Sequence, residues 1–177
     1  MLEMIGTGID RISDLLGYLA AAIFFLIGLV IAFEVVSRYV FLAPTTWAEE
    51  GARLLQLWAT YGALAYILKT RAYIRITALV VILPLRLRQF LEFFALLWII
   101  SFSVVVAWYG YEIARESVEI GRATETMNQV PMVWTEAAIP IGFSVLLLQG
   151  CVEMCKLFKH GTLDRSDERD ELGSEFH

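Results

Sequence analysis

Long uncharged blocks dominate the pattern of hydrophobic and polar positions along the chain. Residues 15–33 carry no charged side chain, and a second uncharged block covers residues 93–111. A helix needs roughly 20 predominantly apolar residues to cross the hydrocarbon core of a bilayer. Both blocks have about that length, so each predicts a membrane-spanning helix.

Two further spans are less obvious because charged residues lie at their ends. The uncharged residues 54–68 are too short to cross alone, but Thr46 and Glu49 form a capping-box pattern that starts the helix earlier. The last apolar block covers residues 131–158, and Pro140 within it predicts a kink. The expected helices are therefore residues 15–41, 46–69, 85–115 and 131–158, which make residues 1–160 a single all-α transmembrane domain.

Positive charges are unevenly distributed beside these spans. Ten of the 14 Lys and Arg residues fall in the N-terminal segment, in the segment between the second and third helices, and in the C-terminal segment. The other four belong to the segments on the opposite side of the predicted helices. Segments rich in Lys and Arg stay in the cytoplasm. The sequence therefore predicts an integral membrane protein with four crossings and both termini on the cytoplasmic side.

Three flanking segments complete this plan. An apolar stripe at helical spacing near the N-terminus consists of Ile5, Ile9, Ile12 and Leu16. This stripe and residues 73–83 are each expected to be either a short helix in the plane of the membrane or a frayed helix end. Residues 161–177 form a polar tail, and its last residues, 173–177, read as a cloning remnant.

Composition and motif content narrow the classes of function. The chain is 58% hydrophobic and 19% charged, and much of the acidity behind its net charge of −5 lies in the tail. Its cysteines are Cys151 and Cys155 and its histidines are His160 and His177, and neither pair suggests a haem, zinc or disulfide-exchange site. The sequence also contains no nucleotide-binding loop or catalytic triad. We predict no catalytic residue, cofactor, metal site or nucleic-acid partner.

Charged residues gather where the first helix ends and the second begins. This corner cluster consists of Glu34, Arg38, Trp47, Glu49, Glu50 and Arg53. Glu34 and Arg38 are one helical turn apart, which suits an ion pair. Ionisable residues in membrane spans are candidates for function. Two interpretations stay open: the cluster is a structural ion-pair group that fixes the corner, or one member contacts a partner subunit or a bound lipid.

The middle of the predicted spans carries almost no polar chemistry. Gln56 and Gln149 are its main strongly polar side chains. A carrier that works alone normally has ionisable or unwound elements near the midplane of the membrane. Small residues suited to close packing, within the bundle or against a partner, follow one face of the first helix at Gly17, Ala21, Gly28 and Ala32. The pattern favours a subunit that holds another protein in place.

The order of several short motifs resembles a known family. Residues 37–41 read Ser-Arg-Tyr-Val-Phe, and Trp-Ala-Glu-Glu follows at residues 47–50. Residues 138–142 read Ala-Ile-Pro-Ile-Gly. Over roughly residues 15–158, the chain resembles the four-helix small membrane subunit of tripartite ATP-independent periplasmic (TRAP) transporters. It departs from the family's His-Ile-x-Val-Asp run, since residues 73–77 read Tyr-Ile-Arg-Ile-Thr.

The resemblance implies a non-catalytic scaffold in the bacterial inner membrane, surrounded by lipid. In such transporters a large membrane subunit carries the substrate with a sodium gradient, and a periplasmic binding protein delivers it, typically an organic acid. The small subunit is expected to bind the large one side-on. By resemblance, part of the docking surface for the binding protein is expected at Glu112, Arg115, Glu116, Glu119 and Arg122, the alternative being a solvated loop.

The residues leave two other classes of membrane protein open. One is a self-contained, proton-coupled small multidrug-type exporter with Glu34 as its proton site. The other is a membrane anchor subunit of a redox enzyme. Co-elution with a large hydrophobic subunit favours the scaffold, a functional homodimer favours the exporter, and a haem spectrum favours the anchor.

Overall fold

The computed structural model describes residues 2–70, 84–126 and 128–160 of the chain. Four long helices make up its body, α1 (Leu2–Tyr39), α2 (Trp47–Lys69), α4 (Leu85–Ile120) and α6 (Ala138–His160), and the short α5 (Val133–Glu136) precedes α6. An isolated antiparallel bridge joins Ala123 to Pro131 in the connection between α4 and α5. The all-α class predicted from the sequence is confirmed.

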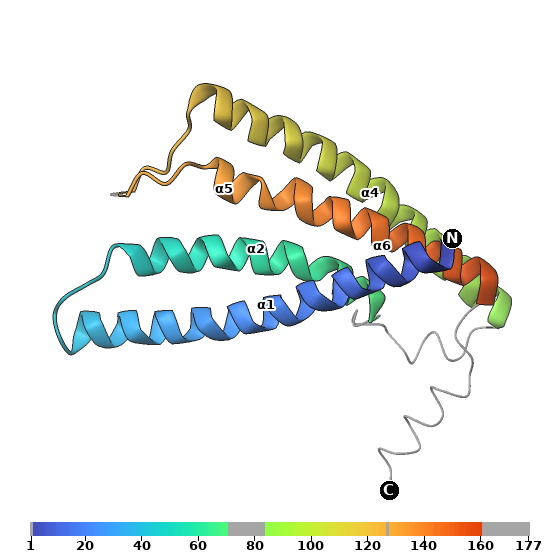
Figure 1. Cartoon of the computed structure of the whole chain (residues 1–177), viewed down its shortest axis with the longest axis horizontal. Coiled ribbons are helices and arrows are strands. Elements are labelled where there is room, and N and C mark those ends of the chain that lie inside the picture. Colours follow the sequence, from blue (N-terminus) through green and yellow to red (C-terminus); the bar gives the residue numbers. More distant parts are fainter. Residues whose placement is uncertain (1, 71–83, 127, 161–177) are drawn as a thin grey trace, which may run out of the picture.

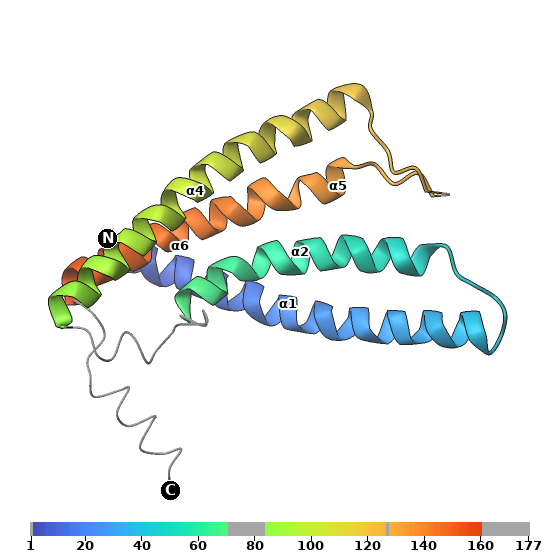
Figure 2. The ribbon, with the colours of Figure 1, turned by 180° about the vertical axis from the view of Figure 1, so that it is seen from behind.

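The long helices lie side by side in the order α1, α2, α6, α4 (Figure 1). α1 and α2 run antiparallel, as do α4 and α6, whereas α2 and α6 run parallel to each other. The helices converge at the end where α1 begins and α6 ends, and they spread apart at the other end, as the reverse view also shows (Figure 2). α1 and α4 therefore form the two outer edges of the arrangement.

Among the described residues, three helical stretches are long and apolar enough to cross a membrane: Gly6–Tyr39, Gln89–Ile120 and Val133–Phe158. Protein covers least of the edge helices: 17% of the most apolar window of α1 and 6% of that of α4 are buried, against 33% for Val133–Phe158. A helix satisfies all its backbone hydrogen bonds internally, so it can face lipid with apolar side chains. The 23-residue α2 is not among these stretches, and acidic residues in its first turn and Lys69 in its last make its ends polar.

The first helix begins earlier than predicted. α1 is continuous from Leu2 to Tyr39, so the stripe of apolar residues near the N-terminus is part of it. Of the two alternatives for this stripe, a separate interfacial helix is wrong, because α1 has no break there. Opposite the stripe, Asp10 and Ser13 contact α6 and Asp14 contacts Lys69 of α2. The buried positions Ser13, Ala20, Ile27 and Glu34 recur every seven residues. Such spacing places one row of side chains against a neighbouring helix.

Two glycines mark where helices approach closely. A Cβ added at Gly17 of α1 would lie 2.3 Å from the ring of Tyr66 in α2, and one at Gly142 of α6 would lie 2.6 Å from the carbonyl oxygen of Tyr61 in α2. Gly28, in contrast, has open space around its Cβ position, and Ala21 and Ala32 are exposed. Of the small-residue face predicted on the first helix, only Gly17 packs inside the bundle.

The third helix ends later than residue 115, at a glycine cap. Gly121 adopts the left-handed conformation (φ 69°). The N–H of Gly121 donates to Val118 O and that of Arg122 donates to Ser117 O. This is the Schellman pattern that satisfies the last carbonyls of a helix.

The predicted start of the second helix and the kink of the fourth are realised differently than expected. Thr46 precedes α2 but makes no side-chain cap hydrogen bond, so the capping box is wrong. The expected kink appears as the break between α5 and α6 at Ala137. Pro140 has no N–H to donate to Glu136 O, which weakens the helix there. The predictions for residues 73–83 and 161–177 lie outside the described residues.

The contrast between Gly142 and Gly28 gives a test of the packing. Gly142→Ala is expected to lower the stability of the chain by about 1–3 kcal/mol, because the added methyl meets the α2 backbone and forces α2 and α6 apart. Gly28→Ala is the control, since its methyl enters open space and alanine favours helix. Thermal unfolding of the full chain in detergent measures both, and equal effects would contradict the packing described.

Candidate functional site

Glu34 organises the corner between α1 and α2. Its Oε1 accepts hydrogen bonds from Arg38 Nε (3.2 Å) and Nη2 (2.8 Å). Its Oε2 accepts the Thr45 N–H at 3.1 Å and the Thr45 hydroxyl. Ser37 lies two residues before the end of α1. Its backbone carbonyl accepts the Ala43 N–H, and its hydroxyl donates to Ala43 O at 2.6 Å. Together these bonds hold the connecting loop against the last turns of α1.

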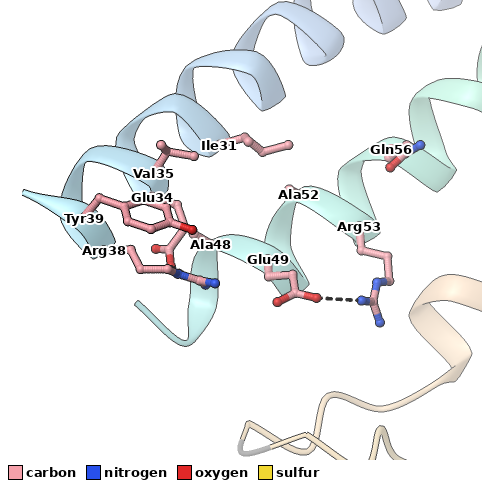
Figure 3. Close-up of a pocket in the computed structure, with 10 residues that line it drawn as sticks. All are labelled: Ile31, Glu34, Val35, Arg38, Tyr39, Ala48, Glu49, Ala52, Arg53 and Gln56. Carbon is pink, nitrogen blue, oxygen red and sulfur yellow. Dashed lines mark hydrogen bonds and ion pairs between the residues drawn. The ribbon is translucent and has the colours of Figure 1, made fainter. Parts of the chain in front are cut away.

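A second ion pair lies across from the first, on α2. Arg53 Nη2 contacts Glu49 Oε1 at 2.9 Å, and both side chains are more than 60% exposed. The Glu34 side chain, by contrast, is only 11% exposed. The two pairs face a shared groove of about 380 Å³ between α1 and α2, which is lined by Ile31, Glu34, Val35, Arg38, Tyr39, Ala48, Glu49, Ala52, Arg53 and Gln56 (Figure 3).

The other two members of the corner cluster point elsewhere. Glu50 accepts a hydrogen bond of 2.7 Å from Asn128 Nδ2, and Asn128 also donates to Thr46 O. Trp47 is half exposed and stacks on Phe33 with ring centroids 6.4 Å apart. The structure therefore divides the cluster into two separate ion pairs on the groove, a contact between α2 and the α4–α5 connection, and an exposed aromatic ring.

The predicted docking residues lie around the end of α4 and its connection to α5. Arg115 pairs with Glu119 at 2.9 Å, and Arg122 pairs with Glu116 at 2.9 Å. Glu112 is exposed on the same helix. The Asn128 contact ties the connection to α2, so these charges are held at the spread end of the molecule, the same end as the corner cluster.

At the opposite end, a polar network connects α1 and α6. The fully buried Gln149 accepts from Ser13 Oγ (2.8 Å) and donates to Asp10 Oδ1 (2.9 Å) and Glu153 Oε1 (3.1 Å). Lys156 lies 3.0 Å from Asp10 and 2.8 Å from Glu153. Every polar atom of the Gln149 amide group therefore has a partner.

The same network reaches α2. Lys69 Nζ lies 2.6 Å from the Asp14 carboxylate and donates to the backbone carbonyl of Asp10. Three helices are thus joined where they converge. From the sequence, Gln149 was predicted to lie near the middle of the membrane with almost no other polar side chain around it, so this network was missed. The signal was present in the spacing, because Gln149, Glu153 and Lys156 share one face of a helix and Asp10 and Ser13 share another.

The described acidic, histidine and cysteine side chains do not gather as metal ligands would. In residues 2–70, 84–126 and 128–160, no group of three or more His, Cys, Asp or Glu side chains is placed to hold a metal ion. Cys151 and Cys155 are free and exposed. The polar side chains described above bind one another and fix the geometry of the helices.

Comparison with known families decides the class of protein. The model of the DctQ component of tripartite ATP-independent periplasmic transporters matches residues 27–160. The chain belongs to this family. Searching the curated proteins gave no match.

As a DctQ component, the chain is the small membrane subunit of a TRAP transporter. The matched residues include the corner cluster, the residues predicted to dock the binding protein and the whole of α6. The family therefore confirms the resemblance found in the motifs, and it gives no support to the exporter or to the redox anchor. Such transporters also contain a large membrane subunit and a binding protein.

The two ion pairs of the groove allow a matched test of the corner. Glu34→Gln removes the carboxylate that holds Arg38 and Thr45, so it is expected to lower the thermal unfolding temperature of the chain. Glu49→Gln breaks an equivalent pair that is exposed on both sides, and such pairs contribute little. Thermal melts of both variants in one detergent check this. A larger loss in Glu49→Gln would contradict the role given to Glu34.

Proposed function

We propose that this chain is a non-catalytic scaffold of a sodium-coupled TRAP transporter in the bacterial inner membrane, which takes up organic acids. The observation that supports this most is the contrast between its polar and apolar parts. The polar groups at the two ends pair largely with one another, whereas the edge helices present long apolar surfaces that the chain itself leaves uncovered. The large subunit would carry the substrate and sodium sites.

α2 is proposed as the fourth crossing. Its 23 residues rise about 35 Å at 1.5 Å per residue, enough for a hydrocarbon core of about 30 Å. It lies between α1 and α6, both long enough to cross. With four crossings, the distribution of Lys and Arg favours cytoplasmic termini. The corner cluster and the α4–α5 connection then face the periplasm.

The exposed face of α1 is the proposed contact for the large subunit. Ala21, Gly28 and Ala32 follow one face of this edge helix without packing inside the bundle, and Phe25 lies between them. Small residues let membrane helices approach closely. The side-on binding implied by the family requires such an uncovered edge.

The charged surface at the end of α4 is proposed as part of the docking surface for the binding protein. Its ion pairs, Arg115–Glu119 and Arg122–Glu116, are largely exposed. Exposed charges guide the approach and the register of a soluble partner more than they add to affinity. Docking here would bring the binding protein beside the large subunit.

Assembly is tested by a bulky substitution on each edge. Gly28→Trp is expected to reduce co-purification of the large subunit severalfold, because the indole fills the face on which the partner packs. Val104→Trp, at an exposed position of α4, is the control and is expected to co-purify normally. Loss of co-purification in Val104→Trp alone would indicate that the large subunit binds α4 and not α1. A large subunit that never co-purifies would contradict the scaffold role.

Docking is tested by exchanging the charges of one ion pair. The double variant Arg115→Glu, Glu119→Arg keeps a pair at the same spacing but inverts the surface. In right-side-out vesicles, it is expected to raise severalfold the concentration of added binding protein that gives half-maximal uptake, with co-purification of the large subunit unchanged. An unchanged concentration dependence would leave these residues as a solvated surface.

A further inference from the structure

The groove between α1 and α2 combines balanced charge with an apolar floor. Two cations, Arg38 and Arg53, and two carboxylates, Glu34 and Glu49, line its opening, so its formal charge is zero. Ile31 and Val35 extend the lining along α1 toward the middle of the helix. Its volume of about 380 Å³ lies within the roughly 300–1,000 Å³ of small-molecule sites.

The charged groups keep unused bonding capacity. An arginine has five N–H donors, and the hydrogen bonds among the described residues use two on Arg38 and one on Arg53. The ion pair on α2 uses Oε1 of Glu49. Spare guanidinium donors suit the oxygens of a phosphate, and the exposed carboxylate suits an ammonium group. A ligand that carries both charges would match the groove.

The groove also lies at the level expected for lipid headgroups. Arg38 and Tyr39 close the apolar stretch Gly6–Tyr39, and Arg53 belongs to the first half of α2. Tyr39 in the lining is strongly exposed, and Trp47, next to Ala48 of the lining, is half exposed. Exposed Tyr and Trp side chains concentrate at the boundary between hydrocarbon and headgroups.

We propose that this groove binds a single phospholipid of the phosphatidylethanolamine class. Its phosphate contacts Arg38 and Arg53, its primary ammonium contacts Glu49, and one acyl chain follows Ile31 and Val35 along α1. An anionic lipid without an ammonium group offers no donor to Glu49. A choline headgroup has the positive charge but no N–H to donate. The order of affinity is therefore phosphatidylethanolamine, then phosphatidylcholine, then phosphatidylglycerol.

Native mass spectrometry of the delipidated full chain, with each lipid added in turn, measures this order. Wild-type protein is expected to bind one phosphatidylethanolamine. Arg53→Gln should weaken that binding about tenfold, since it removes charge-assisted hydrogen bonds. Val35→Trp should weaken it by filling the groove from an exposed position. Arg115→Gln breaks an equally exposed pair of the same spacing and length away from the groove, and should have no effect.

Several results would overturn the proposal. Equal affinity for the three lipids, or unchanged binding by Arg53→Gln, would mean non-specific lipid association. Displacement of the lipid by inorganic phosphate would mean a free-anion site. Absence of the lipid from the complex co-purified with the large subunit would mean that the groove is covered by protein. The proposal stands apart from transport, because none of these measurements depends on uptake.

Discussion

Inside a bilayer there is no water to satisfy a polar group, so each one carried by a spanning helix needs a partner from the protein. This constraint explains where the helices of this chain are joined. Gln149 and the charges around it connect α1, α2 and α6 at one end, and Glu34 holds the α1–α2 loop at the other. Between these two polar ends, packing rests on small residues such as Gly17 and Gly142, which let helix backbones approach closely.

The same constraint gives the molecule its open shape. Polar partners fix the helices at the converging end, while at the spread end the link between the α1–α2 corner and the α4–α5 connection passes through Asn128, which bonds Glu50. The helices lie next to one another in a row, so α1 and α4 keep long apolar faces uncovered. The scaffold role proposed for this subunit needs such a face. A carrier that encloses its own pathway would instead turn polar groups toward a central site.

Burial separates polar residues that look alike in the sequence. Glu34–Arg38 and Glu49–Arg53 are both ion pairs one helical turn apart, yet Glu34 is largely covered and Glu49 is exposed. The covered carboxylate holds a loop, and the exposed pair keeps donors and acceptors that no described residue uses. Two ion pairs of the same spacing can therefore differ in role, because a covered pair stabilises the fold and an exposed pair is accessible for binding.

The sequence by itself determined the helical class, the approximate helices and the family, because apolar block length and short motifs are local properties. Which face of α1 is buried was decided only by tertiary structure. Its small residues at Ala21, Gly28 and Ala32 face outward, and a row with Ser13 and Glu34 faces inward. The spacing of residues along α1 cannot show what each of them contacts. Ser13 binds Gln149 and Glu34 binds Thr45, and both partners come from other segments of the chain.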